Sequence, residues 1–169
     1  ELNPAEINWV TQKGYQVAEV EPLRAKGRVP APEVQVRING QKSWLALDIS
    51  QPFLILKETE FNLDNFAPSR IVSIVHKGNE MLMEDGFIKN IQILGEDYDM
   101  THCSLLKKSS KKIYSKGLIG RNFFQNKTIT LDFKAEAIAY SDEDIKPLQK
   151  SYKIPVFFKQ SPDISYPNL

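Results

Sequence analysis

The sequence has little cysteine, no long apolar run and no excess of charge of one sign. Its single cysteine, Cys103, cannot form an internal disulfide, so cysteine content does not identify a redox compartment. No apolar stretch approaches the ~20 residues that a membrane-spanning helix needs, so we expect no transmembrane segment. Lysine and arginine (22) nearly balance aspartate and glutamate (21), which argues against nucleic acid as a partner. A 169-residue chain of this composition is typical of one globular domain.

Motifs for metals and cofactors are also missing. The two histidines, His76 and His102, are far apart, and with one cysteine they give no metal-site spacing. The sequence contains no glycine-rich phosphate loop and no Ser-His-Asp motif. His102 and Cys103 are neighbours in an expected strand, so their side chains point to opposite faces and cannot form a dyad. We therefore expect no metal and no cofactor.

The N-terminal segment carries the signals of a helix start. Asn3 can cap a helix, Pro4 suits its first position and Glu6 completes a capping box. Gly14 suits a left-handed stop, so the pattern predicts a helix over about residues 4–13. We assign residues 1–28 to an N-terminal helical extension. The chain begins with Glu1 instead of Met, which favours a leader that was removed or left out.

Most of the remaining sequence predicts short strands. Apolar and polar residues alternate over 34–38, Asn39-Gly40 is the strongest short signal for a tight hairpin, and 43–47 forms the return strand. Many short strands with turn signals and little helix are typical of an all-β barrel or sandwich. Further strand pairs are expected at 71–76 with 81–83, 87–94 with 98–106, and 128–133 with 137–140.

One motif pair carries the functional information. Asp48 emerges from the apolar strand in Leu47-Asp48-Ile49-Ser50-Gln51, and much later comes Gly117-Leu118-Ile119-Gly120-Arg121-Asn122. This combination resembles the retropepsin-like aspartic proteases, the single-lobed relatives of the retroviral enzymes. The resemblance implies an acid-protease fold, a closed β-barrel over residues 29–144. It also implies that the second motif passes beneath the Asp48 loop and enters a short helix. The structural motif residues are Gly117, Gly120, Arg121 and Asn122.

The resemblance also assigns roles outside the motif. The hairpin over 71–84 stands where the family has its substrate-covering flap, with a tip at Lys77, Gly78 and Asn79. Apart from the resemblance, the prolines after Tyr140 favour a C-terminal extension over residues 145–169, which we expect to wrap the domain or pair with a partner chain. Related bacterial proteins are often exported, so the expected location is periplasmic or secreted.

The active-site loop departs from the family pattern. Aspartic proteases use two carboxylates that share a proton, so a single-lobed chain needs a homodimer with one Asp48 from each subunit. Active members read Asp-Thr-Gly or Asp-Ser-Gly, with a hydroxyl at the second position that bonds across the dimer axis. Here Ile49 has no donor or acceptor, Ser50 replaces glycine, and Gln51 opens a stretch without the acidic residues of retroviral members.

The altered loop leaves two functional hypotheses. The favoured one is a pseudoprotease, a binding or structural module for a peptide or protein ligand, which is a monomer or weak homodimer. In that case Asp48 is an ordinary Asx-turn residue that closes a strand. The alternative is a homodimeric aspartic endopeptidase in which Asp48 is catalytic.

Overall fold

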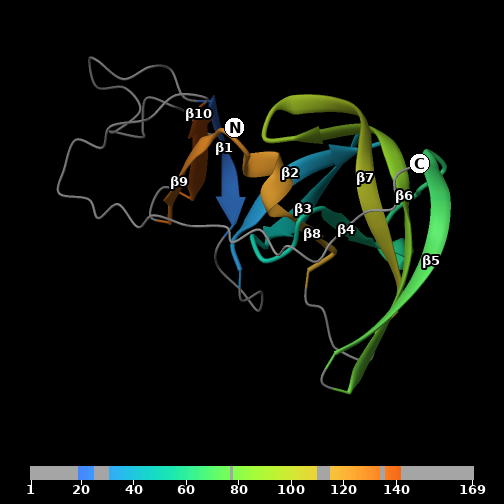
Figure 1. Cartoon of the computed structure of the whole chain (residues 1–169). Coiled ribbons are helices and arrows are strands. Elements are labelled where there is room, and N and C mark those ends of the chain that lie inside the picture. Colours follow the sequence, from blue (N-terminus) through green and yellow to red (C-terminus); the bar gives the residue numbers. More distant parts are fainter. Residues whose placement is uncertain (1–18, 25–30, 77, 110–114, 134–135, 142–169) are drawn as a thin grey trace, which may run out of the picture.

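The computed structural model describes residues 19–24, 31–76, 78–109, 115–133 and 136–141 (Figure 1). Within these ranges the only helical elements are the 3₁₀ turns η2 (Glu58–Glu60) and η3 (Arg121–Phe124). The helix expected at 4–13 and the extension at 145–169 lie outside the described residues. The strands are β1 (Glu19–Arg24), β2 (Glu33–Ile38), β3 (Gln41–Leu47), β4 (Leu54–Lys57), β5 (Phe66–His76), β6 (Asn79–Ile93), β7 (Glu96–Ser109), β8 (Gly117–Ile119), β9 (Thr128–Asp132) and β10 (Ala137–Ser141).

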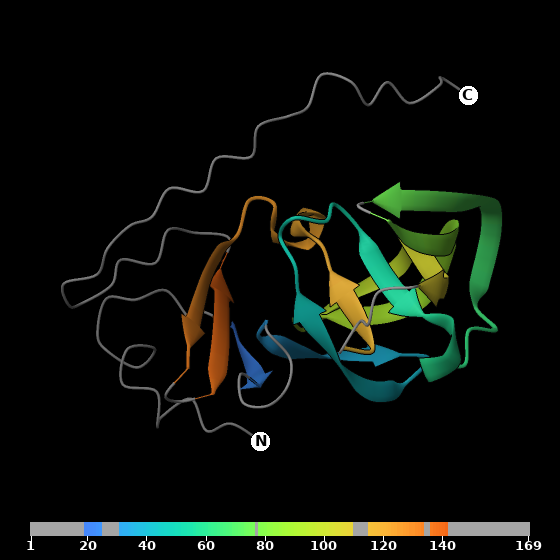
Figure 2. The same ribbon diagram turned by 90° about the horizontal axis from the view of Figure 1, so that it is seen from below.

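The strands form one sheet that closes on itself. Its order is β5-β6-β7-β4-β8-β3-β2-β1-β10-β9, and an additional pairing of β6 with β2 completes the circle. The closed barrel therefore consists of β6, β7, β4, β8, β3 and β2, while β9 and β10 form a hairpin beside it (Figure 2). This confirms the all-β fold that the strand signals predict and the closed barrel that the resemblance implies.

Period-two alternation builds the core. Each strand directs every second side chain into the barrel, where Val34, Val36 and Ile38 are buried as their alternation predicts. Burying a large aliphatic side chain stabilises the fold by about 1.5–3 kcal/mol relative to leaving it exposed. The other fully buried large side chains are Leu45, Leu54, Leu56, Ile88, Ile91, Ile93, Ile119 and Ile138.

Two tight turns set the register of the hairpins. Asn39 (φ 51°) and Gly40 (φ 78°) are both left-handed, as the twist of a two-residue hairpin requires. The turn between β6 and β7 uses Leu94 (φ 51°) and Gly95 (φ 74°), one residue earlier than the expected turn at 95–97. Leu94 is only 2% exposed, so its core contacts offset the strain of a left-handed apolar residue.

Strand β1 differs from the expectation, because residues 19–24 lie within the segment 1–28 that the sequence signals assign to a helical extension. The strand divides its pairing: residues 19–22 pair with β10, and Leu23 and Arg24 pair with β2. Pro22 interrupts the sequence pattern of a strand, since proline is rare inside strands. It is tolerated here because β2 pairs only with the two residues after it. The sheet thus begins before residue 29.

In the part of the chain that the structure describes, no helix is long and apolar enough to cross a bilayer.

Candidate functional site

Strand β8 lies between β3 and β4, and this placement creates the site. It runs parallel to β3, with Leu118 opposite Ala46, and antiparallel to β4, with Leu118 opposite Ile55. The chain that leaves β3 at Leu47 must therefore cross the end of β8 to reach β4. Asp48 is the first residue of that crossing. The expected passage of the second motif beneath the Asp48 loop is thus present.

Backbone hydrogen bonds tie the crossing loop to the segment below it. The crossing loop is irregular, and the first N–H groups of η3 have no partner within the turn, so the two segments can bond to each other. The bonds run from the Asp48 N–H to the Ile119 carbonyl (3.0 Å), from the Arg121 N–H to the Gln51 carbonyl (2.8 Å), and from the Asn122 N–H to the Pro52 carbonyl (3.1 Å). The two sequence motifs therefore form one unit.

Gly120 makes this close approach possible. A Cβ atom at this position would lie 2.3 Å from the Phe53 carbonyl oxygen and 2.5 Å from the Pro52 carbonyl carbon. Only glycine fits at this separation. The guanidinium Nη1 of Arg121, the next residue, donates a hydrogen bond to the Ser50 carbonyl (3.2 Å).

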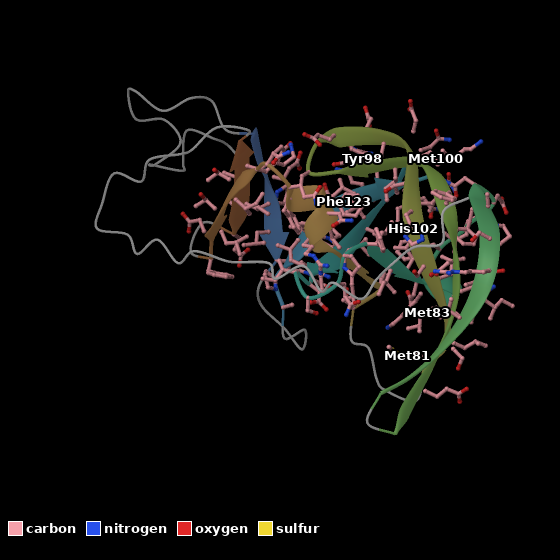
Figure 3. All side chains as sticks on the ribbon, in the orientation of Figure 1. Met81, Met83, Tyr98, Met100, His102 and Phe123 are labelled. Carbon is pink, nitrogen blue, oxygen red and sulfur yellow. The ribbon has the colours of Figure 1, made fainter. Side chains whose placement is uncertain are left out.

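The turn η3 anchors the end of the second motif. The backbone hydrogen bonds of the Arg121 and Asn122 N–H groups hold its start, without a side-chain cap. Phe123 is buried and meets the ring of Tyr98 on β7 edge-on, with centroids 5.4 Å apart (Figure 3). This contact fixes the segment that supports the Asp48 loop from below.

The Asp48 carboxylate is half-buried and bonded within its own loop. Its Oδ1 accepts hydrogen bonds from the Ser50 N–H (3.0 Å) and from the Ser50 hydroxyl (2.6 Å). The Gln51 N–H donates to the Asp48 carbonyl (3.1 Å). This is the geometry of an Asx turn. In the described residues no cation forms an ion pair with this carboxylate.

Ile49 and Ser50 occupy the outer surface of the loop. The Ile49 residue is 50% exposed, so an alkyl group lies where the family pattern has a hydroxyl. The loop's hydroxyl is at position 50 instead, and it bonds inward to Asp48. The structure therefore brings Asp48, Ile49, Ser50 and Gln51 together with Arg121 and Asn122, but with the loop's polar groups directed at each other.

The hairpin of β5 and β6 occupies the expected flap position in the sequence. Its pairing runs from Phe66 with Ile88 to His76 with Asn79. Gly78 (φ 76°) lies in the turn, and Lys77 is outside the described residues. The hairpin expected over 71–84 is thus present as a structural element.

A histidine between two phenylalanines adjoins the loop, and no pattern in the sequence predicts this contact. His102 extends from β7 (Figure 3), with its ring centroid 4.3 Å from that of Phe53 and 5.7 Å from that of Phe87. Phe53 ends the Asp48 loop. The His102 Nδ1 atom is buried without a hydrogen-bond partner in the described part of the chain. Burial lowers the pKa of His102, against the opposing charge of Asp85.

Asp85 on β6 is a second carboxylate, and both of its oxygens accept hydrogen bonds. It is 8% exposed, accepts from the Ser104 hydroxyl (2.6 Å) and accepts from Arg70 Nε (3.1 Å). The register places Arg70, Asp85 and Ser104 directly opposite one another on β5, β6 and β7. This row is structural, because each oxygen of the carboxylate has a donor.

Cys103 faces the core, away from His102. It is fully buried, and burial raises the pKa of its thiol, so it is not a nucleophile. The absence of a histidine–cysteine dyad follows from the alternation of β7. The described segments also contain no group of three or more potential metal ligands.

No protein-family model matches the chain, and no curated protein matches it. Among solved structures, it is similar to the crystal structure of a retropepsin-like aspartic protease from Rickettsia conorii. The two are 14% identical with a TM-score of 0.46, and the match covers 76% of this chain and 96% of that chain. The closed barrel and the Asp48 crossing are properties of this chain's own strand pairing.

Proposed function

We propose that this chain is a pseudoprotease: a retropepsin-like barrel that binds a peptide or protein and does not hydrolyse it. The observation that carries the proposal is the Asp48 loop. Its carboxylate oxygen Oδ1 accepts two hydrogen bonds from Ser50, while the neighbouring Ile49 presents an alkyl surface. The hydrogen bonds to this carboxylate thus come from within its own loop, and the side chain at position 49 offers no polar group to a second loop.

Peptide hydrolysis by this class of site needs two carboxylates at close range. One is ionised and activates a water molecule, and the other is protonated and polarises the scissile carbonyl. Two Asp48 loops would have to meet across a two-fold axis. Two exposed Ile49 side chains could pack there, but apolar packing does not fix loop geometry as hydrogen bonds do. Catalysis is sensitive to misplacements of about 1 Å.

The competing function is a homodimeric aspartic endopeptidase, and one observation favours it. Asp48 is only half-buried and has no ion-pair partner among the described residues, so a water molecule or a second carboxylate can approach it. The two hypotheses make opposite predictions about a single substitution, Asp48→Asn.

The deciding experiment measures cleavage and binding on the same full-length protein. Unfolded protein and peptide libraries are incubated from acid to neutral pH with and without pepstatin. We expect no pepstatin-sensitive cleavage. We also expect Asp48→Asn and the exposed control Asp99→Asn to retain any peptide binding equally. Cleavage by the unmodified chain that Asp48→Asn abolishes and Asp99→Asn preserves would establish the endopeptidase instead.

A gain-of-function pair makes the test sharper. Ile49→Thr combined with Ser50→Gly restores the family's loop sequence around Asp48. If the barrel still supports the catalytic geometry, this variant should associate through its loops and begin to cleave peptides. The single variant Ser50→Gly, which leaves Ile49 in place, should not.

A further inference from the structure

Strand β5 is an open edge of the sheet. It contains 11 residues, stands at one end of the strand order and pairs with β6 alone. Figures 1 and 2 both show it on the outside of the barrel. No strand in the described part of the chain pairs with its other side. In an antiparallel edge strand, about half of the backbone N–H and C=O groups point away from the partner strand.

Only the beginning of this edge is protected against pairing. Pro68 lacks an N–H, and the register shifts between Pro68 and Arg70. Both features are typical of guarded edges. The next five residues, 71–75, read Ile-Val-Ser-Ile-Val and contain no charge, proline or glycine. Ile71 is 70% exposed. Such segments have a high tendency to add another strand.

We propose that a second copy of this chain pairs antiparallel with this edge, on a two-fold axis through Ser73. This register opposes Ile71 with Val75 and Val72 with Ile74, so every pair beside the axis is apolar and β-branched. Such cross-strand pairs are favourable, and no like charges meet. Two-fold pairing also removes both open β5 edges at once and cannot extend into a fibre.

The opposite end of the sheet fits this role less well. Strand β9 is short, half-buried throughout and ends in Asp132. The β5 dimer also leaves the Asp48 loop outside the interface. Dimerisation of this kind is therefore independent of the loop-to-loop dimer that an endopeptidase would need.

Cysteine cross-linking tests the register directly. Residues directly opposite in an antiparallel pair have Cα atoms about 4.5–5.5 Å apart, which is within disulfide range. Ser73→Cys in the full-length chain should therefore form a disulfide-linked dimer under mild oxidation. The native Cys103 is buried and does not compete. The matched control is Ser69→Cys, an exposed serine of the same strand whose two copies would be about 27 Å apart, and it should remain monomeric on a non-reducing gel.

Charge substitution tests the same two-fold axis without cross-linking. Ser73→Lys or Ser73→Glu places two like charges opposite each other and should weaken the dimer severalfold at low salt. Mixing the two variants should restore it as a heterodimer. Met100→Lys adds the same charge on β7 and should change nothing. The proposal would be overturned by a full-length chain that sediments as a monomer. Equal cross-linking at 69 and 73, or a dimer insensitive to charge at 73, would overturn it as well.

Discussion

Replacing Gly120 with alanine should push the Asp48 loop away from the segment beneath it. The new methyl group would lie 2.3 Å from the Phe53 carbonyl oxygen and 2.6 Å from the Phe53 nitrogen. Both are backbone atoms, so no side-chain rotation relieves the overlap. The loop must retreat by roughly 1 Å before these contacts become ordinary. Gly120 has a φ of −82°, so alanine adds no conformational strain.

The expected loss of stability in Gly120→Ala has two contributions. Overpacking of this kind costs about 1–3 kcal/mol. The retreat also weakens the hydrogen bonds from Arg121 to Gln51 and from Asn122 to Pro52, each worth about 0.5–1.5 kcal/mol net. Because strain and bond loss partly relieve each other, we expect the free energy of unfolding to fall by about 2–4 kcal/mol.

Urea unfolding measures that loss, and amide hydrogen exchange locates it. The Arg121 and Asn122 amides should exchange faster in Gly120→Ala. Gly40→Ala is the control: it adds the same methyl group in open space, and its φ of 78° costs about 1–2 kcal/mol by itself. It should leave both amides protected. A Gly120→Ala protein that loses less than about 0.5 kcal/mol, with both amides still protected, would refute this view of the crossing.

Three further outcomes are expected. Ser104→Ala removes a donor from buried Asp85 and should cost about 1–3 kcal/mol in urea unfolding, whereas the exposed Ser69→Ala should change little. Burial holds the pKa of His102 below its ordinary 6.5. At a pH between the folded and unfolded pKa values, the unfolded chain therefore binds a proton that the folded chain does not bind. The contribution of neutral His102 to the free energy of unfolding should thus be fully present above pH 6.5 and decline as pH falls toward the folded pKa. The variant His102→Gln should lack this part of the decline. Cys103, at 0% exposure, should react with a thiol reagent only as fast as the chain unfolds, and rapid labelling of the native protein would contradict its placement.

The hairpins were predictable because their signals are local. Asn39-Gly40 and the alternation around it specify a turn and two strands without help from the rest of the chain. Strand β6 was predicted only in pieces, since Glu84, Asp85 and Gly86 look like a break between 81–83 and 87–94. The strand is continuous because Ser104 and Arg70 satisfy Asp85. Gly86 in turn lets the Ala67 carbonyl approach to a point where a Cβ would be 2.2 Å away.

In the candidate site, too, some contacts could be predicted from local sequence signals and others could not. The meeting of Asp48 with Gly120 could be expected, because a recognisable motif carries it. The edge-to-face contact of His102 with Phe53 could not, since it depends on the parallel register of β4 with β7, in which Leu54 lies opposite Cys103. No turn residue or periodicity encodes a register between strands so far apart in the sequence. Nor does the sequence show that Ser50 directs its hydroxyl at Asp48.

The insertion of β8 between β3 and β4 also has a consequence for how the protein is made. The hairpins β2–β3 and β5–β6–β7 pair neighbours in the chain and can form early, whereas β8 must find two partners synthesised long before it. Gly117 packs against Leu45 and Leu56, which β8 separates from solvent. A nascent chain that has not yet emerged past Ile119 is thus an open barrel with an apolar slot. The barrel can close only after the three residues of β8, Gly117–Ile119, have been synthesised and have paired with β3 and β4.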